Sequence, residues 1–323
     1  MARCSFGWGA ARAAVVVALV ASSGCASRGA SFGSRFVKPG EPSTTFDEPG
    51  TAPAPAPPLS DYMRKLRALQ SKAVPKSSLL PTIESTNPLL AQSLMLLTIQ
   101  ETPATHRLVA AAYRRAGVLD YAFRHYQRAT VLDPSDAVSY DAMARIWRDW
   151  GMPDLALPDA YRALQCDRTS AEIYNTLGTI FEALGQPSGA QRAYTQAIAI
   201  DPRAAFALNN LCYLEMDAGH EAAATSFCER ALSIDPGFTA ARNNLALIQA
   251  RNGDLAAAEH QLTSGPVSAS SLYNVGVLRL SEARYTEAAA AFGQAVEAQP
   301  SMILARQRLV QARKAARAAE QSR

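Results

Sequence analysis

Few residues of this 323-residue chain have types and spacings that suit catalysis. Its four histidines, His106, His125, His220 and His260, do not follow the spacing of a metal site. The sequence also has no H-E-x-x-H motif, no glycine-rich phosphate loop and no G-x-S-x-G motif. We therefore expect no catalytic residue, no metal, no cofactor and no small-molecule substrate, and we predict that the chain is not an enzyme.

The side chains with the clearest chemical potential are amides. Asn209 and Asn210 form one pair, and Asn243 and Asn244 form a second pair 34 residues later. A side-chain amide both donates and accepts hydrogen bonds, so a row of asparagines could pair with the backbone of an extended peptide without reading its sequence. The sequence thus favours a peptide-binding role for these four amides.

The stretch from Ala171 to Pro202 indicates which elements position such side chains. Its apolar and small residues, read at the helical period, form two stripes on either side of a turn at Gly185, which predicts two antiparallel helices. The positions that define the pattern are Leu177, Gly178, Phe181, Ala190, Tyr194, Ala197 and Pro202. Their distribution resembles the tetratricopeptide repeat (TPR), which has a period of about 34 residues.

One helical hairpin cannot bury its own hydrophobic face, so the pattern should recur. Two small positions recur in steps of 34 residues with a last step of 30, and a closing position recurs in steps of 34 except for a fourth step of 30. They are Ala110, Ala144, Gly178, Cys212, Ala246 and Gly276 in the first helix, Ala122, Ala156, Ala190, Ala224, Ala258 and Ala288 in the second, and Pro134, Arg168, Pro202, Pro236, Pro266 and Pro300 at the close. The resemblance implies an all-α fold, a right-handed αα superhelix (TPR solenoid) of about six repeats over residues 103–302.

In TPR superhelices the concave wall comes from the first helix of each pair. Carried onto this sequence, the wall positions of the first two repeats are basic: Arg107, Arg114, Arg115, Arg145 and Arg148. The later wall positions form an amide-lined and apolar peptide groove: Asn175, Phe206, Asn209, Asn210, Tyr213, Met216, Asn243, Asn244, Leu247, Asn274, Val277 and Leu280. The resemblance implies protein partners bound in this groove. Alternatively, the asparagines bond to neighbouring helices, as is common in the repeat consensus.

Two cysteines occupy positions that face each other across one hairpin. Cys212 and Cys228 are residues 8 and 24 of the fourth repeat, whose turn falls near residue 16. In an oxidising compartment they could form a disulfide; the alternative is two small buried thiols. We expect Cys166 to be unpaired and buried near a helix end.

The first residues have the features of an export signal. Arg3 and Arg12 precede an apolar run from Ala13 to Ala21, which is too short to span a bilayer and fits a signal peptide over residues 1–24. Residues 21–25 resemble a bacterial lipobox with Cys25 as the lipidated residue, although Ser22 stands where the family favours Leu. Plain cleavage near Ser23 or Ala26 is the alternative.

The location implied by that resemblance is the periplasmic face of the outer membrane, because Ala26 is not the Asp that marks inner-membrane retention. Residues 25–60 are rich in Pro, Ser and Gly and predict a disordered tether. Residues 61–102 predict N-terminal helices or a half-repeat, with one helix starting at Asn87-Pro88. This region either seals the solenoid or binds a partner.

The last repeats depart from the regular pattern. The fifth repeat lacks four residues between Leu262 and Pro266, which predicts a second helix about one turn short. Residues 303–323 predict a C-terminal capping helix, with Leu304, Leu309 and Ala312 facing inward. Its outward arginines could instead meet an acidic partner or lipid headgroups.

The overall charge gives no reason to expect nucleic-acid binding. Without Arg3 and Arg12, 30 basic residues face 28 acidic ones. Signal, lipobox, tether and repeats together resemble bacterial TPR lipoproteins, and the short fifth repeat with residues 241–254 and 273–300 resembles TadD-like proteins of Flp (tight-adherence) pilus assembly. That resemblance implies a scaffold for a pilus or secretin machinery. The alternative is a periplasmic adaptor for cell-wall enzymes or general envelope biogenesis.

Overall fold

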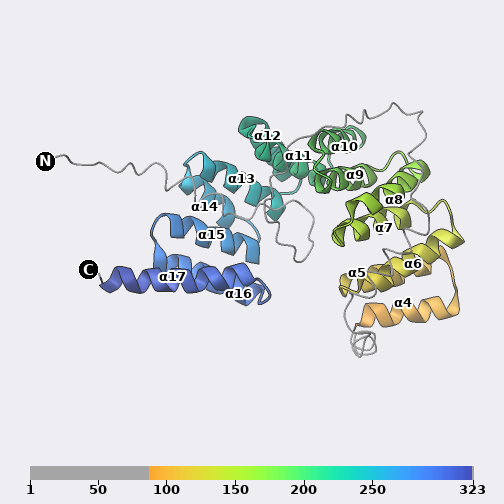
Figure 1. The fold of residues 1–323 in the computed structure, drawn as a ribbon, viewed down its shortest axis with the longest axis horizontal. Coiled ribbons are helices and arrows are strands. Elements are labelled where there is room, and N and C mark those ends of the chain that lie inside the picture. Colours follow the sequence, from red (N-terminus) through yellow and green to blue (C-terminus); the bar gives the residue numbers. More distant parts are fainter. Residues whose placement is uncertain (1–86, 322–323) are drawn as a thin grey trace. The chain divides into compact units, whose positions relative to one another are not determined.

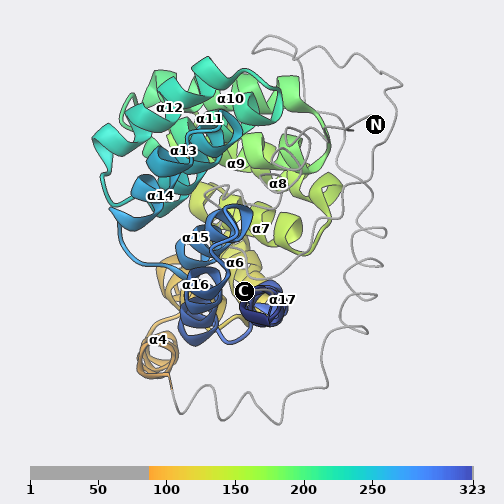
Figure 2. The ribbon, with the colours of Figure 1, turned by 90° about the vertical axis from the view of Figure 1, so that its left-hand side faces the viewer.

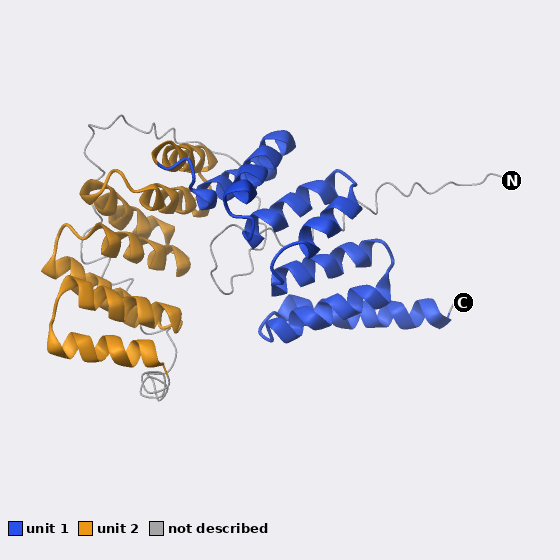
Figure 3. Ribbon diagram, turned by 180° about the vertical axis from the view of Figure 1, so that it is seen from behind, with its two compact units in different colours: residues 1–26, 201–323 blue, residues 27–200 orange. Residues whose placement is uncertain are grey.

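The computed structural model describes residues 87–321, which form fourteen α-helices and contain no strand. The chain divides into two compact units, whose described parts are residues 87–200 and residues 201–321 (Figure 3). None of the helices in the described part has the length and apolarity needed to cross a bilayer. The predicted signal peptide, Cys25, the tether and most of residues 61–102 lie outside the described residues.

The unit of residues 87–200 consists of one helix followed by three antiparallel helix pairs (Figure 1). Within each pair the two helices pack on each other, and α4–α5, α6–α7 and α8–α9 contacts join successive elements. The helices are α4 (Pro88–Ile99), α5 (Pro103–Arg115), α6 (Leu119–Leu132), α7 (Ala137–Asp149), α8 (Pro153–Cys166), α9 (Ala171–Ala183) and α10 (Pro187–Ile200). The α4 helix begins where its sequence indicates, because the Asn87 side chain accepts a hydrogen bond from the Leu90 amide.

The unit of residues 201–321 has three further helix pairs and a last, longer helix (Figure 2). The helices are α11 (Ala205–Asp217), α12 (Glu221–Ile234), α13 (Thr239–Arg251), α14 (Leu255–Thr263), α15 (Ala269–Ser281), α16 (Tyr285–Ala298) and α17 (Ile303–Gln321). Consecutive pairs pack on one another in both units, as is typical of a TPR solenoid. The predicted all-α repeat fold is confirmed.

Close packing across the hairpin explains the small residues of the pattern. All twelve predicted small positions are buried. A Cβ atom added at Gly178 would overlap the ring of Tyr194, and one added at Gly276 would lie 2.7 Å from Cε1 of Phe292. The two residues of each contact are 16 positions apart, one on each helix of the hairpin, so a buried aromatic ring takes the space that a side chain on the first helix would need.

The turn between paired helices has one repeated backbone conformation. The first five hairpins place glycine there with a positive φ of 70 to 85°, at Gly117, Gly151, Gly185, Gly219 and Gly253. The sixth hairpin has Ala283 at the same place with a φ of 58°. A left-handed conformation costs a residue with a Cβ atom about 1 kcal/mol, and glycine avoids this cost.

We therefore expect Ala283→Gly to raise the free energy of unfolding by about 0.5–1 kcal/mol, because it removes the strain at the end of α15. Urea unfolding followed by circular dichroism measures the change. Gly253→Ala is the matched control at the preceding turn and should destabilise the protein by about 1 kcal/mol. A loss of stability in Ala283→Gly would contradict the argument.

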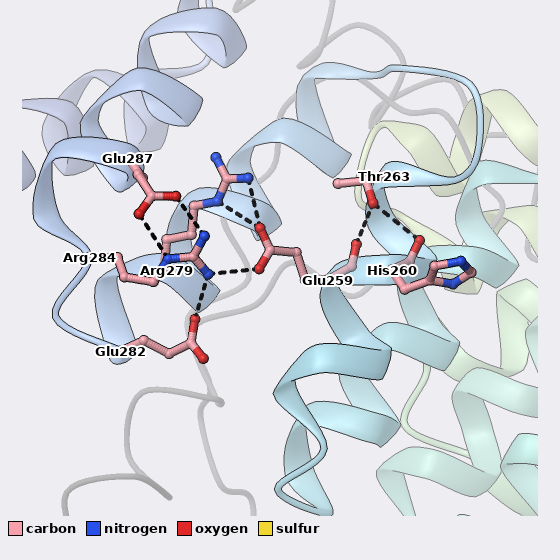
Figure 4. Close-up of polar contacts among 7 residues, drawn as sticks. All are labelled: Glu259, His260, Thr263, Arg279, Glu282, Arg284 and Glu287. Atoms are coloured by element: carbon pink, nitrogen blue, oxygen red, sulfur yellow. Dashed lines mark hydrogen bonds and ion pairs between the residues drawn. The ribbon is translucent and has the colours of Figure 1, made fainter.

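The shortened hairpin is held by ion pairs. As predicted, α14 has only nine residues, whereas α16 has fourteen. Glu259 on α14 accepts hydrogen bonds from Arg279 Nε at 2.8 Å and from Arg284 Nη1 at 2.9 Å, and Arg284 also pairs with Glu282 and Glu287 (Figure 4). These partners bring the pKa of Glu259 below its usual value despite partial burial. The network fastens α14 to α15 and to the start of α16.

The last helix differs from its prediction in one detail. Ala312 is buried and Leu309 is half-buried, as expected, but Leu304 is 52 % exposed, and Ala305 is buried in its place. The fully buried positions of α17 are thus alanines, which pack closely on α16, with Leu309 half-buried between them. The prediction for Leu304 is wrong.

Candidate protein-interaction site

An open pocket of about 410 Å³ lies among the first helices of the first three repeats. Its lining combines charged and apolar side chains, and all of its residues belong to the unit of residues 87–200. The lining residues are Ala111, Arg114, Arg115, Tyr126, Ala137, Val138, Asp141, Ala142, Arg145, Asp167, Ser170, Glu172 and Ile173. Three of the five predicted basic-wall residues, Arg114, Arg115 and Arg145, therefore come together here.

Arg145 is held in place by α7 and α9. Its Nε lies 2.8 Å from Oδ2 of Asp141, one helical turn earlier, and donates to Oγ1 of Thr176 at 3.0 Å. Within residues 87–321 neither of its Nη groups donates a hydrogen bond. The side chain is fixed at its base, while the donors at its tip remain available.

Asp141 is the buried acid of the pocket. It is only 9 % exposed, and its Oδ1 has no hydrogen-bond partner among the described residues. Burial raises the pKa of Asp141, although Arg145 and Thr176 favour its charged form. A buried carboxylate oxygen without a donor costs free energy, and the ion pair with Arg145 offsets part of this cost.

The remaining basic residues fall into two groups. Arg114 and Arg115 are exposed at the pocket and form no ion pair with the described residues. Arg107 instead pairs with the buried Asp136 at 2.8 Å, and Arg148 pairs with Asp149 and donates to Thr179 at 2.6 Å. These last two side chains hold neighbouring elements together and do not line the pocket.

The amide side chains of the predicted groove are mostly buried, which corrects the prediction that they line an open surface. Asn209 and Asn244 are fully buried, and Nδ2 of Asn244 donates to Oδ1 of Asn209 at 3.0 Å. Asn210, Asn243 and Asn274 are at most 2 % exposed. These amides face the seam between helices, so they cannot pair with a peptide backbone, and the alternative role of bonding between neighbouring helices is the one observed.

The other predicted groove residues are divided between the core and the surface. Met216, Leu247 and Val277 are buried with the amides. Asn175, Phe206, Tyr213 and Leu280 are half-buried, which leaves part of each side chain accessible. Only these four of the twelve predicted groove residues remain available to a ligand.

Because Asn209 and Asn244 bond to each other, we expect Asn209→Ala to lower the free energy of unfolding by about 2 kcal/mol, since it removes a buried hydrogen bond and leaves a cavity in the core. Urea unfolding measures the loss. Asn252→Ala, at an exposed helix end, is the control and should change stability by less than about 0.5 kcal/mol. Equal stability of the two variants would contradict a packing role for Asn209.

The two cysteines are separated by the same number of residues as the glycine and the aromatic residue that touch across the other hairpins. The structure joins Cys212 on α11 and Cys228 on α12 in a disulfide with a Cα–Cα distance of 5.3 Å, and the two residues are 16 apart. Cys166 differs from its prediction, because it is exposed at the end of α8. The prediction placed it near a helix end, which is correct, but expected it to be buried, whereas the last turn of α8 points this residue outward.

A histidine pair escaped the sequence analysis. Nδ1 of His106 on α5 lies 2.9 Å from Nδ1 of His125 on α6, and Nε2 of His106 lies 3.2 Å from Glu101. Burial lowers the pKa of His125 to about 4, and the charge of His106 acts in the same direction. The residues are 19 apart and follow no short motif, so only the predicted hairpin geometry could have brought them together. Among the described residues no group with metal-binding geometry is present.

The fold and these contacts define a protein built of tetratricopeptide repeats. Two segments match family models described as tetratricopeptide repeat, residues 171–204 and residues 269–302. They are the third and the sixth of the predicted repeats, and the other pairs follow the same packing. The sequence matches none of the curated proteins with which it was compared.

Several solved structures are similar to the chain in fold. A chain of the APC/C hetero-tetramer Cut9–Hcn1 has a TM-score of 0.60 and 17% identity, over 79% of this chain and 52% of the matched chain, so this protein spans about half of that length. PilF of Pseudomonas aeruginosa has a TM-score of 0.51 and 18% identity, over 64% of this chain and 95% of PilF. PilW, a type IV pilus biogenesis factor, has a TM-score of 0.55 and 20% identity, over 66% of this chain and 98% of PilW. At these identities the likeness shows the fold alone.

Proposed function

We propose that the protein is a scaffold anchored by lipid to the periplasmic face of the outer membrane, where it binds partner proteins during assembly of a pilus or secretin machinery. The observation that carries the binding role is the pocket of α5, α7 and α9, with Arg114 and Arg115 exposed and Arg145 offering free donors. Stacked helix pairs present such side chains on a stable surface, and TPR folds typically serve protein interaction. The protein acts by binding and not by catalysis.

The envelope location rests on the N-terminal sequence. The apolar run after Arg12 and the lipobox-like residues 21–25 support export and lipidation at Cys25. The proline-rich residues 25–60 would then separate the repeats from the membrane surface. The fold shared with PilW is consistent with a pilus-assembly role, and the TadD-like features of the fifth and sixth repeats point the same way.

We expect Cys25→Ser to release the protein from the outer membrane and to lower the amount of secretin multimers, because both lipid attachment and local concentration are lost. Membrane fractionation and immunoblotting measure the two effects. Cys166→Ser is the matched control, since this exposed cysteine lies in the folded repeats and should leave the protein in the membrane fraction.

Crosslinking and pull-down from membranes identifies the partners. Recovery of secretin or pilus components with the wild type supports the proposal. Recovery of envelope hydrolases, with secretin multimers unchanged in Cys25→Ser, would instead show an adaptor for cell-wall enzymes. Turnover of a substrate by the purified protein would reject the scaffold.

A further inference from the structure

We propose that the outward side of α17 (Figure 1) binds the anionic headgroups of a phospholipid membrane. The surface, here called the basic stripe, consists of exposed side chains only: Arg306, Val310, Arg313, Lys314 and Arg317. This contact goes beyond the lipid anchor of the proposed function, because it belongs to the folded repeats and does not need a lipidated cysteine. Its support comes from the charge of α17, from the free donors along it and from the shape of its surface.

The basic stripe lies on the side of α17 that faces away from α16. Ala305 and Ala312 are fully buried where α17 packs on α16. Arg306, Arg313 and Arg317 follow one another at spacings of seven and four residues, which places them in one row on the opposite side of the helix. The row spans about 17 Å, since an α-helix rises about 1.5 Å per residue.

The charge of α17 is opposite to that of the rest of its unit. Residues 201–302 contain six arginines, no lysine and eleven acidic residues, whereas residues 303–321 contain five basic residues and one acidic residue. A solubilising cap needs polar side chains of either sign, so the cap alone does not explain this separation of charge. An anionic surface repels the acidic helices and attracts α17, which gives the contact a defined orientation.

Three side chains of the basic stripe have their donors free for a ligand. Among the described residues, Arg313, Lys314 and Arg317 form no hydrogen bond and no ion pair. Arg306, by contrast, donates to the carbonyl oxygen of Pro300. The free guanidinium and ammonium groups suit the phosphate oxygens of headgroups, which accept charge-assisted hydrogen bonds.

The shape of the basic stripe favours a membrane over a peptide. An open hollow of about 430 Å³ runs among its side chains, and every described residue that lines this hollow belongs to α17. An extended peptide is held in a groove or along a sheet edge, whereas a membrane needs contact on one side only. Val310, which is 68 % exposed between Arg306 and Arg313, can enter the boundary between headgroups and acyl chains.

The contact is weak alone and effective near an anchor. Each basic side chain strengthens binding to an anionic surface about fivefold, and salt screens this attraction. Such a patch does not hold a protein at a membrane without a second signal, so release in Cys25→Ser remains the expected result. With the lipid attached, the predicted tether of residues 25–60 would keep α17 at a high local concentration near the surface.

Co-sedimentation with vesicles tests the proposal. The protein is residues 25–323, the form left after removal of the predicted signal peptide, with Cys25→Ser so that no lipid is attached. We expect this parent protein to bind vesicles of phosphatidylcholine with about one third phosphatidylglycerol, but not vesicles of phosphatidylcholine alone, and to be released by high salt. Arg313→Gln/Arg317→Gln should bind at least about tenfold more weakly.

Two further variants separate the basic stripe from net charge and from a protein partner. Arg168→Gln/Arg203→Gln removes two exposed arginines outside α17 and should bind as the parent protein does. Arg313→Lys/Arg317→Lys keeps the charge and should bind nearly as well, because a fluid lipid surface does not require the fixed fork of arginine. Circular dichroism of each variant confirms that the fold is retained.

No binding to the anionic vesicles, or equal weakening in both glutamine variants, would overturn the proposal. So would binding of a hexaglutamate peptide that is lost in Arg313→Lys/Arg317→Lys, because this pattern indicates an acidic protein partner. Failure of the vesicle test with partner recovery intact rejects only the basic stripe, whereas loss of all partners with normal vesicle binding rejects the scaffold.

Discussion

Gly178→Ala will lower the free energy of unfolding by about 2–3 kcal/mol, although alanine is the better helix former. The added methyl group would occupy the space of the Tyr194 ring, which is fully buried and whose hydroxyl donates to Glu182. Neither ring nor helix can move without opening the hairpin of α9 and α10. Urea unfolding followed by circular dichroism measures the loss.

Gly293→Ala is the matched control for this substitution. Gly293 also lies inside a helix, α16, but an added Cβ atom would meet nothing within 4 Å. This variant should be more stable than the wild type by about 0.5–1 kcal/mol through helix propensity alone. If both glycine variants gained stability, the aromatic ring would not be the reason for glycine at position 178.

Removal of the Cys212–Cys228 disulfide is expected to cost about 3 kcal/mol, because the bond closes a loop of 16 residues in the unfolded chain. The double variant Cys212→Ala/Cys228→Ala should unfold at lower urea concentration than the wild type, and dithiothreitol should destabilise only the wild type. Cys166→Ala, which removes the exposed thiol, is the control and should leave the midpoint unchanged.

A second double variant of Cys212 and Cys228 tests whether their hairpin has the same packing as the hairpin of Gly178 and Tyr194. Cys212→Gly/Cys228→Tyr reproduces the contact of Gly178 with Tyr194 in the same 16-residue register. In the presence of reductant it should be more stable than the double alanine variant, because the ring fills the space between the helices. Equal stability would show that the fourth hairpin does not share the packing of the third.

The repeat fold follows from the sequence because its determinants are local. Small residues such as Ala110 and Ala190 recur at the buried positions of each hairpin, and glycine recurs at turns such as Gly185 with a positive φ. Both requirements act within one hairpin, so a single sequence reveals them. The missing turn of α14 follows equally directly, from a gap of four residues.

The candidate site could be predicted less completely from the sequence, because its geometry depends on contacts between several repeats. Asn209 lies on the first helix, where the wall was expected, yet its side chain turns into the seam and meets Asn244 of the next repeat. Asp141 and Arg145 carry a readable signal, an acid four residues before a base on a helix. Their third partner, Thr176, lies 31 residues beyond Arg145, and no short pattern connects the two.

The ion network around Glu259 has a consequence for cooperativity. In a repeat array each hairpin is stabilised mainly by its neighbours, so unfolding spreads from the weakest interface. With nine residues, of which only Ala258 and Leu262 are buried, α14 offers less apolar contact than any other helix of a pair. Arg279 and Arg284 replace that contact by charge, and salt screens charge far more than it affects apolar packing. We therefore expect added salt to weaken the coupling of the last repeats to those before them.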